Sequence, residues 1–426
     1  MPAERGGLEG SRVASGARLA VFGSTGSVGR QALEVVDAFA ESLQVTCLTT
    51  GESTGLLAQQ CQKYRPKLAV VATASAGSEL ENALNGLGTE VLSGPEAVLE
   101  AAASDVYDVA LMAIAGVAAL EPTLEILRQR KKLALANKES LVAGGHLIMR
   151  EAQLPSLGSG NLAAPTRTVA GQSDSDGSTR WERAALIPVD SEHSALYQLL
   201  GEVDVGEVAG ITLTASGGPF LNVPKSELCN ATPQMALRHP TWRMGPKVTV
   251  DSANLMNKGL EVIEASWLFA LPPSQIQVLI HPQSVVHSFL NLTDGTSLAQ
   301  LSLPDMRIPI QYALLGRQRS PYPALALPAC GPLSFEEPDP DRFPCLLLAY
   351  RAAQMGGTAP AVLSAADEEA VRLFLEGKIC FTGIAKAVEA TLDKHTPVEN
   401  PTLEEVLAAD AWGRQEVRIY WQASRE

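Results

Sequence analysis

Residues Leu19 to Gly29 read LAVFGSTGSVG, and this segment sets the architecture of the first half of the chain. Four apolar residues predict a short buried strand, a turn with three glycines follows, and helical periodicity then runs from Gln31 to about Ala40. Such a unit lets backbone N–H groups approach a pyrophosphate at the helix N-terminus. The GxxGxxG spacing is one residue wider at its start than the usual dinucleotide fingerprint, so an ordinary tight turn remains an alternative.

Strands and helices continue to alternate beyond this unit. We expect strands over 45–49, 68–71, 109–112 and 133–136, and helices over 54–63, 96–102 and 120–128. This order predicts a doubly wound parallel sheet, which makes residues 17–154 a Rossmann-like α/β domain. Residues at the carboxyl ends of such strands contact the ligand. Glu52 follows the second strand, where a carboxylate favours NAD over NADP, and Asn137-Lys138-Glu139 follow the last one.

Length and composition describe a globular protein of two or three domains. The chain has 426 residues, of which 46% are hydrophobic and 19% charged, and no apolar run approaches the length of a membrane span. The net charge of -14 argues against a nucleic-acid-binding surface. Six scattered cysteines without a CxxC pair fit reduced thiols in the cytoplasm. Residues 1–16 lack the hydrophobic run of a secretory signal, and we expect a disordered extension there.

Two acidic residues follow the next expected strand, Ala185 to Val189. They form the sequence Asp190-Ser191-Glu192, in which two carboxylates flank a hydroxyl. Carboxylate oxygens are the hard ligands that Mg²⁺ or Mn²⁺ prefers, although a capped helix start gives the same pattern. Residues 155–179, just upstream, are rich in Gly, Ser, Pro, Asp and Thr, and we expect a flexible insertion without chemistry of its own.

Two loops farther along have the residues of a substrate site. Ser216-Gly217-Gly218 can form an anion-holding nest or a plain turn. Residues His239 to Gly245 place a histidine and a tryptophan between a proline and a glycine, which suggests a lid that closes over substrate. A buried tryptophan that anchors the loop is the competing interpretation.

The segment Lys247 to Phe269 has a polar helical face. Its first four residues alternate as in a short strand, Asp251-Ser252 can cap a helix, and Asn257 and Glu261 then lie four apart with Lys258 beside them. This cluster would suit a phosphate and a metal-bound oxygen, whereas the alternative is a solvated helix face.

An Asp-Gly pair at 294–295 predicts a hairpin between strands over 285–290 and 297–303. His281 and His287 lie close by without a third soft ligand. A structural or substrate-facing role is therefore favoured over a zinc site.

These motifs together resemble the 1-deoxy-D-xylulose 5-phosphate reductoisomerase family. They occur in the family's order between about residues 19 and 312, and a weaker similarity continues over 360–367. The matching segments are GSTGSVG at 23–29, LANKESLV at 135–142, PVDSEHSA at 188–195, TASGGPF at 214–220, HPTWRMGPKVTVDSANLMNKGLEVIEA at 239–265 and HPQSVVHS at 281–288.

The resemblance implies a function and a set of site residues. The expected reaction is a metal-dependent rearrangement of 1-deoxy-D-xylulose 5-phosphate and its NADPH-dependent reduction to 2-C-methyl-D-erythritol 4-phosphate, in non-mevalonate isoprenoid biosynthesis. The expected ligands of Mg²⁺ or Mn²⁺ are Asp190, Glu192 and Glu261, and the expected catalytic residues are Lys138, Glu192 and His239. The resemblance assigns the substrate to Ser191, Glu192, Ser216, His239, Ser252, Asn257, Lys258 and Glu261. It assigns NADPH to Thr25, Gly26, Ser27, Val28, Gly51, Glu52, Ser53, Asn137, Glu139 and Gly245.

The chain departs from the family's pattern in three places. Gly51-Glu52-Ser53 stands where the family usually has a polar or basic residue and an asparagine, and a carboxylate there would repel a 2′-phosphate. We still expect NADPH. Ser194 and Leu221 replace the more usual asparagine and arginine, and we expect minor effects. The insertion over 155–179 is longer than is typical.

The remainder of the chain predicts a third domain. Residues 316–341 are proline-rich and read as an extended linker, and helical periodicity resumes over 345–355, 362–375, 384–392, 403–409 and 415–423. We therefore expect a catalytic and dimerisation domain over 180–315 with an α+β fold and a C-terminal helical bundle over 342–426. The hairpin's sheet edge and the family suggest a homodimer.

Two alternatives to this function remain from the residues. A semialdehyde or homoserine-type dehydrogenase lacks support because no cysteine-nucleophile motif is recognisable. A catalytically inactive nucleotide sensor is disfavoured by the presence of Lys138, Glu192 and Glu261 together.

Overall fold

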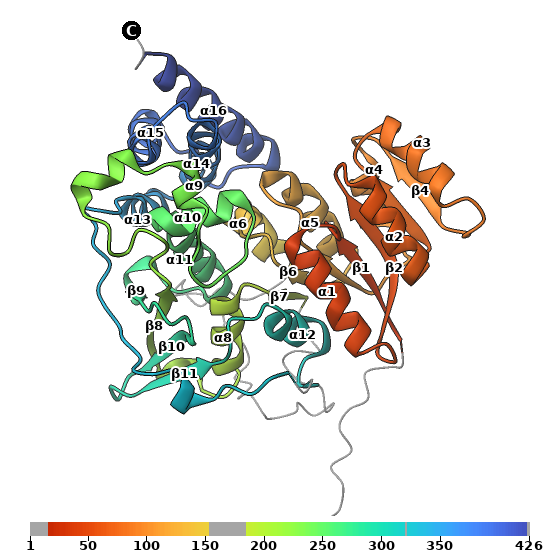
Figure 1. Cartoon of the computed structure of the whole chain (residues 1–426), viewed down its shortest axis with the longest axis horizontal. Helices are drawn as coiled ribbons and strands as arrows, with labels where there is room; N and C mark the ends of the chain where they lie inside the picture. Colours follow the sequence, from red (N-terminus) through yellow and green to blue (C-terminus); the bar gives the residue numbers. More distant parts are fainter. Residues whose placement is uncertain (1–15, 153–184, 320–321, 424–426) are drawn as a thin grey trace, which may run out of the picture.

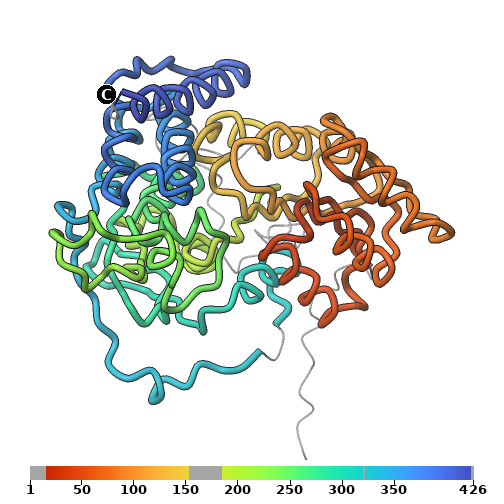
Figure 2. Tube along the Cα trace, turned by 45° about the horizontal axis from the view of Figure 1, so that its top comes forward, coloured from red at the N-terminus to blue at the C-terminus, as the bar shows by residue number. Residues whose placement is uncertain are grey.

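The computed structural model describes residues 16–152, 185–319 and 322–423 (Figures 1 and 2). The expected extension over 1–16, apart from its last residue, and the expected insertion over 155–179 lie outside the described residues.

The first domain is a seven-stranded parallel sheet with helices on both faces. The order is β4-β3-β2-β1-β5-β6-β7, so the chain starts in the middle of the sheet and winds outward in both directions. The doubly wound parallel sheet is therefore confirmed. Its strands are β1 (Ala17–Phe22), β2 (Leu43–Thr50), β3 (Leu68–Val71), β4 (Glu90–Ser93), β5 (Val109–Met112), β6 (Lys132–Leu135) and β7 (Leu186–Pro188). Its helices are α1 (Ser27–Ala38), α2 (Thr54–Tyr64), α3 (Ala74–Ala83), α4 (Ala97–Ala103), η1 (Val117–Ala119), α5 (Leu120–Arg128) and α6 (Lys138–Glu151).

The glycine turn after β1 has no room for side chains. Gly23 has a φ of +85°, and a Cβ on it would lie 2.7 Å from the carbonyl oxygen of Ala113. A Cβ on Gly29 would lie 2.3 Å from the carbonyl oxygen of Gly23. The turn thus needs these glycines to bring α1 against β1, as the fingerprint predicts.

Helix α3 and strand β4 were not expected from the sequence. Both lie at the outer end of the sheet, as the orange segment of Figure 1 shows. All four residues of β4 are exposed or half-buried, so this edge strand lacks the apolar run of a buried parallel strand.

The second domain contains a four-stranded sheet of order β11-β10-β8-β9, and this α+β fold agrees with the expectation. Strands β10 and β11 form the predicted hairpin, and its turn is held by a hydrogen bond from the Thr296 N–H to Oδ1 of Asp294 at 2.9 Å. The strands are β8 (Val208–Ala215), β9 (Ile276–Ile280), β10 (Val286–Leu292) and β11 (Ser297–Leu301). The helices are α8 (Ser191–Leu199), η2 (Val205–Glu207), η3 (Lys225–Asn230), α9 (Pro233–Ala236), α10 (Pro246–Asn254), α11 (Met256–Phe269), η4 (Pro273–Gln275) and α12 (Arg307–Leu315).

The strand expected at the start of the segment Lys247 to Phe269 is wrong. Residues 246–254 form helix α10, which has Pro246 in its first turn, where proline is favourable. The chain breaks at Leu255, whose φ is +66°, before α11 begins. Asp251 and Ser252 therefore lie inside α10 and do not cap a helix.

The C-terminal region is helical, as predicted, and packs against α6 and α11 (Figure 1). The described part of the linker over 316–341 contains only η5 (Leu327–Ala329) and runs along the outside of the second domain (Figure 2). The two last helices expected from the sequence are one helix, and a Cβ on Gly413 in its middle would lie 3.2 Å from the carbonyl oxygen of Val362 on α14, so the glycine allows close packing of the two helices. The helices are α13 (Cys345–Met355), α14 (Ala359–Leu375), α15 (Phe381–Lys394) and α16 (Leu403–Ala423). None of the helices in the described ranges has both the length and the apolar character needed to cross a membrane.

Candidate functional site

A cavity of about 1040 Å³ lies between the first and second domains. Helix α1 of the first domain lines one side with Ser27 and Val28, and α6 contributes Lys138. The second domain surrounds the rest of the cavity with residues from several separate segments. These residues include Asp190, Ser191, Glu192, Ser216, Gly245, Ser252, Asn257, Lys258 and Glu261, all of which the sequence identifies as site residues.

Three carboxylates meet in this cavity. Asp190 and Glu192 stand at the start of α8, directly after β7, and Glu261 lies on α11. One oxygen of each lies within 4.8 Å of the other two. The Asp190 side chain also accepts a hydrogen bond from the Glu192 N–H at 3.4 Å, so the capped helix start and the carboxylate pair exist together.

Two lysines neutralise part of this charge. Nζ of Lys138 lies 2.6 Å from Oδ2 of Asp190 and 3.1 Å from Oε1 of Glu261. Nζ of Lys258 pairs with Glu261 and lies 3.4 Å from Oε1 of Glu192. Asn257 accepts a hydrogen bond from Lys138 at 2.9 Å and donates one to Glu261 at 2.6 Å. The polar face of α11 is therefore buried in the site, and the solvated alternative is wrong.

The electrostatics of the cluster favour a divalent cation. Burial, together with the charges of Glu261 and Asp190 and against the opposing charge of Lys258, raises the pKa of Glu192 to about 8. Burial also disfavours the charged form of Asp190, but the charge of Lys138 and a hydrogen bond with His193 hold its pKa well below its usual range. A cation bound by three carboxylate oxygens would relieve the repulsion that raises the Glu192 pKa, so the residues fit Mg²⁺.

Three hydrogen-bonding groups converge beside the cavity, of which Ser216 and Ser252 line it and His239 lies against both serines. The Oγ of Ser216, at the end of β8, lies 2.9 Å from Nε2 of His239. The Oγ of Ser252, on α10, lies 3.0 Å from the same nitrogen and 3.5 Å from Oγ of Ser216. Two hydroxyls and one imidazole around a single point form a cradle for a small oxyanion.

The backbone decides which nitrogen of His239 holds the proton. Nδ1 accepts hydrogen bonds from the N–H groups of Thr241 at 3.1 Å and Trp242 at 2.8 Å, so it must be unprotonated. Burial lowers the pKa of His239 to about 4. The ring is consequently neutral, and its Nε2–H donates into the cradle.

Gly217 and Gly218 allow the backbone to pass close beside this cradle. Their φ values are +79° and +66°, and a Cβ on Gly218 would lie 2.7 Å from the carbonyl oxygen of Ser252. The tight turn after β8 therefore brings Ser216 next to α10.

The expected cofactor residues lie along the carboxyl edge of the parallel sheet, except Gly245, which precedes α10 of the second domain. Thr25 Oγ1 and Thr50 Oγ1 are 2.6 Å apart, and Gly26 precedes the first turn of α1. Asn137 caps α6 by accepting a hydrogen bond from the Ser140 N–H at 2.8 Å, and it donates one to Glu139 at 2.9 Å. Gly51, Glu52 and Ser53 are exposed between β2 and α2.

The loop that the sequence suggests as a lid faces the cavity. Thr241, Trp242, Arg243 and Met244 line the cavity. Trp242 is half-buried, and its ring centroid is 6.4 Å from that of His287. His281 and His287 are buried in the second sheet and bond to neighbouring backbone and hydroxyl groups, which agrees with the structural alternative.

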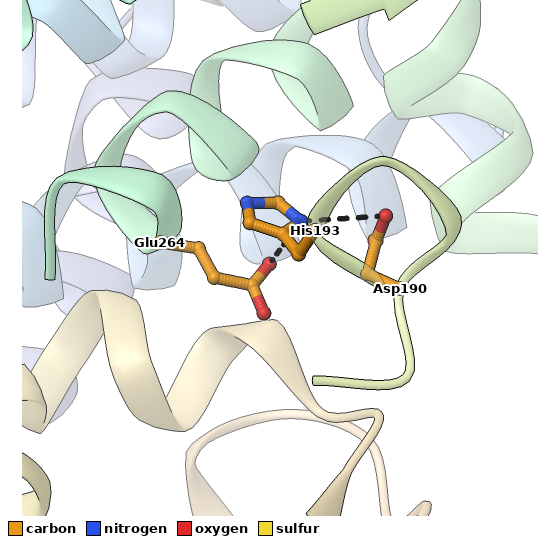
Figure 3. A group of neighbouring side chains, drawn as sticks. All are labelled: Asp190, His193 and Glu264. Atoms are coloured by element: carbon orange, nitrogen blue, oxygen red, sulfur yellow. Dashed lines mark ion pairs between the residues drawn. The ribbon is translucent and has the colours of Figure 1, made fainter. Parts of the chain in front are cut away.

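One buried group behind the carboxylates was not expected. Figure 3 shows the ring of His193 between Asp190 and Glu264. Its Nδ1 lies 3.5 Å from a carboxylate oxygen of each. The sequence signal for Glu264 was its position three residues after Glu261 on the same helix, between the buried residues Ile263 and Ala265.

A second unexpected cluster joins the three domains. Nζ of Lys247, on α10, lies 2.6 Å from Oδ2 of Asp251, 3.1 Å from Oδ2 of Asp367 on α14, and 4.0 Å from Oε1 of Glu139 on α6. Asp251 and Asp367 are fully buried. This cluster connects the C-terminal helices to the two helices that hold Lys138 and Ser252.

Family models match three successive parts of the chain. The 1-deoxy-D-xylulose 5-phosphate reductoisomerase model matches residues 19–145, and the C-terminal domain model of the same name matches residues 186–269. The model described as the DXP reductoisomerase C-terminal domain matches residues 301–416.

Curated proteins of the same name are similar over nearly the whole chain. The 1-deoxy-D-xylulose 5-phosphate reductoisomerase of Pelotomaculum thermopropionicum is 45% identical over 399 residues, which are 93% of this chain and 96% of the relative. That of Moorella thermoacetica is 46% identical, with the same coverage.

Solved structures agree with the sequence matches. The enzyme from Zymomonas mobilis in complex with NADPH has a TM-score of 0.82 at 37% identity, over 96% of this chain and 99% of that chain. A reductoisomerase in complex with NADPH, fosmidomycin and magnesium has a TM-score of 0.85 at 35% identity, with the same coverage.

Proposed function

The chain belongs to the 1-deoxy-D-xylulose 5-phosphate reductoisomerase family, and from that premise we propose how its central cavity performs the family's reaction. It is an NADP-dependent oxidoreductase that uses NADPH and Mg²⁺ to convert 1-deoxy-D-xylulose 5-phosphate to 2-C-methyl-D-erythritol 4-phosphate. Membership in this family excludes the semialdehyde or homoserine-type dehydrogenase and the inactive sensor. The supporting observation is that the carboxylate cluster and the oxyanion cradle open into one cavity, with Lys138 at the carboxylates.

The cradle binds the substrate phosphate. Ser216, Ser252 and the Nε2–H of His239 donate to its oxygens, and Asn257 and Lys258 lie on the side that faces the carboxylates. Because His239 is neutral, Lys258 supplies the positive charge. Binding energy at the phosphate holds the reacting carbons in place at the other end of the cavity.

Asp190, Glu192 and Glu261 hold the divalent cation, which when bound acts as a Lewis acid on the substrate's oxygens. Ser191 is oriented by its hydrogen bond to Oε2 of Glu192 at 2.7 Å and contacts the substrate. Lys138 holds a proton at Nζ close to the reacting oxygens, because Asp190 and Glu261 raise its pKa well above the usual value although burial opposes this.

The residues that would hold the cofactor extend from the start of α6, beside the carboxylates, to the glycine turn. Thr25, Gly26, Ser27 and Val28 offer the N-terminus of α1 to the pyrophosphate of NADPH, which supplies a hydride when bound. Asn137 and Glu139 lie beside Lys138 and orient the ribose nearest to the substrate, with Gly245 opposite. Gly51, Glu52 and Ser53 lie at the adenosine end.

The assay that tests this function measures NADPH oxidation by absorbance with 1-deoxy-D-xylulose 5-phosphate, with and without Mg²⁺ or Mn²⁺. We expect turnover only when the divalent cation is present. If no metal-dependent turnover occurs with NADPH or with NADH, the proposal is wrong.

Three further assignments extend the proposal. Residues 17–154, 180–315 and 342–426 form the cofactor, catalytic and C-terminal domains, with 316–341 as the linker, and β7 extends from the second of these segments to complete the sheet of the cofactor domain. The protein functions in the cytoplasm in non-mevalonate isoprenoid biosynthesis, which subcellular fractionation tests.

The protein forms a homodimer through β11, an edge strand whose outer backbone groups have no strand partner in the described sheet. Leu298 on this strand is 37% exposed. The molar mass of Leu298→Lys and of the unchanged protein, measured by light scattering, tests this interface. A variant that remains a dimer would contradict it.

A further inference from the structure

The ring of His193 touches or adjoins each of the three carboxylate residues of the cluster. Its Nδ1 faces Oδ1 of Asp190 at 3.5 Å, and its Nε2 lies 3.0 Å from the backbone carbonyl oxygen of Glu261. Glu192 is the preceding residue of the chain. A single side chain therefore fixes the orientation of one carboxylate and the backbone position of another.

The hydrogen-bonding groups around the ring define where its protons lie. A carbonyl oxygen only accepts hydrogen bonds, so Nε2 must donate to Glu261. Nδ1 then faces two carboxylate oxygens, one of Asp190 and one of Glu264, both at 3.5 Å. At this distance the contacts of Nδ1 are ion-pair contacts and not hydrogen bonds, and Glu264 supplies the second carboxylate beside the ring.

Glu264 has no other evident structural purpose at this place. Its side chain is buried on α11, and among the described residues its Oε2 has no hydrogen-bond partner. The ring itself stacks on Phe269 with centroids 6.1 Å apart and an interplanar angle of 13°. An apolar side chain would fill this position without the cost of burying a carboxylate, and the ion-pair partner of the Glu264 carboxylate among the described residues is the imidazole of His193.

We propose that Glu264 is a positioning residue that holds the His193 ring against Asp190 and the backbone of Glu261, and so sets the spacing of the three metal-binding carboxylates (Figure 3). This inference rests on the proposed function, because it assumes that these carboxylates bind the cation. It assigns Glu264 no contact with substrate, cofactor or metal. Groups that contact metal ligands orient those ligands, and loss of such a partner weakens metal binding by about 10- to 100-fold.

The test measures Mn²⁺ affinity by electron paramagnetic resonance, which does not depend on turnover. We expect Glu264→Gln to raise the Mn²⁺ Kd at least about tenfold and to leave the NADPH Kd unchanged. The matched control is Glu369→Gln, which also neutralises a buried glutamate. Glu369 pairs with Arg372 and Arg418 on the far helices α14 and α16, so its loss affects folding stability but not the Mn²⁺ Kd.

A double variant separates action through His193 from an independent effect. If Glu264 acts through the ring, His193→Asn with Glu264→Gln has the same Mn²⁺ Kd as His193→Asn alone, within about twofold. If the fold-increases in Mn²⁺ Kd caused by the two single substitutions multiply in the double variant, the proposal is overturned. An unchanged Mn²⁺ Kd in Glu264→Gln would also overturn it. If the unchanged protein itself binds no Mn²⁺, the proposed function fails instead.

A measurement on the unchanged protein covers the case in which a variant does not fold. Nitrogen-15-labelled histidine gives few imidazole signals, because the chain has 6 histidines. We expect Mg²⁺ to shift the signal of one imidazole whose Nε2–H is protected from exchange. If Mg²⁺ shifts no protected imidazole, His193 does not contact the metal ligands and the proposal is overturned.

Discussion

The ammonium group of Lys138 lies 2.6 Å from Oδ2 of Asp190 at the edge of the parallel sheet. The two residues follow the neighbouring strands β6 and β7, whose carboxyl ends point in the same direction. Two chain segments separated by the insertion thus place a cation and a carboxylate in contact. In the proposed function a divalent cation binds the same carboxylate, so Lys138 and the metal would compete for Asp190.

This competition predicts opposite effects of Lys138→Met on metal binding and on turnover. The Mn²⁺ Kd is expected to stay unchanged or fall, because a repelling charge is removed. The kcat is expected to fall by about 10²- to 10⁴-fold, because the proton at Nζ is lost. Electron paramagnetic resonance and the NADPH oxidation assay measure the two quantities. A variant that binds Mn²⁺ more weakly would show that Lys138 supports the ligands instead.

Glu261→Gln should weaken metal binding and remove activity at low metal concentration. Glu261 is fully buried and contacts both Lys138 and Lys258, so the amide also leaves two cations with one fewer carboxylate. Mn²⁺ titration with activity as a second readout checks this. Glu34→Gln is the control, because Glu34 lines the same cavity but is exposed and pairs only with Arg307 among the described residues. Mn²⁺ affinity equal to that of the control would exclude Glu261 from the ligand set.

Glu52→Lys should raise the NADPH-to-NADH ratio of kcat/KM. Glu52 is exposed between β2 and α2, and no cation in the described ranges forms an ion pair with it. Its charge therefore opposes a 2′-phosphate at the adenosine end of the cofactor. Glu41→Lys is the control for net charge, because it precedes β2 at the opposite end of the strand. The same ratio in both variants would mean that the Glu52 side chain points away from the cofactor.

Local patterns in the sequence predicted the parallel sheet, and the resemblance to the family, carried by short motifs, indicated the groups of the cavity. The turn around Gly23 and the motifs around Asp190 and Glu261 each occupy a few adjacent residues. The start of α10 was mistaken for a strand because the residues KVTV alternate in polarity. Their helical form depends on Pro246 before them and on the break at Leu255 after them.

The supporting contacts could not be read from the sequence in the same way. His193 and Glu264 are 71 residues apart, and Lys247 and Asp367 are 120 apart, so only the fold brings them together. Asp367 also lies in an apolar helix of the C-terminal domain, where nothing in its local pattern indicates a partner on α10. The tautomer of His239 likewise depends on the backbone N–H groups of its own loop.

His287 should make the protein less stable in acid. Burial lowers its pKa to about 4, whereas an unfolded histidine titrates near 6.5. Between about pH 4 and pH 6.5 the folded state therefore binds fewer protons than the unfolded state. The contribution of His287 to stability is fully present above pH 6.5 and is lost as the pH falls toward 4. The expected slope from this group is about 1.4 kcal/mol per pH unit.

Urea unfolding of the unchanged protein and of His287→Gln, at several pH values between about 5 and 7, measures this contribution. His239, whose pKa is also lowered, is present in both proteins, so its effect cancels in the difference. The variant should have the flatter dependence of unfolding free energy on pH. Parallel curves would show that His287 does not titrate in this range.

Lys247→Met should destabilise the protein by about 3–5 kcal/mol, because it leaves the buried Asp251 and Asp367 without a cation. Burial raises the pKa of Asp367, so a neutral amide there costs little, and adding Asp367→Asn to Lys247→Met should recover part of the loss. The control is Lys63→Met, which removes a similar 2.7 Å pair with Asp37 at the exposed surface and should cost at most about 1 kcal/mol. Urea unfolding gives the three free energies. If Lys247→Met and Lys63→Met lose the same free energy of unfolding, solvent already screens the charges of the cluster around Lys247.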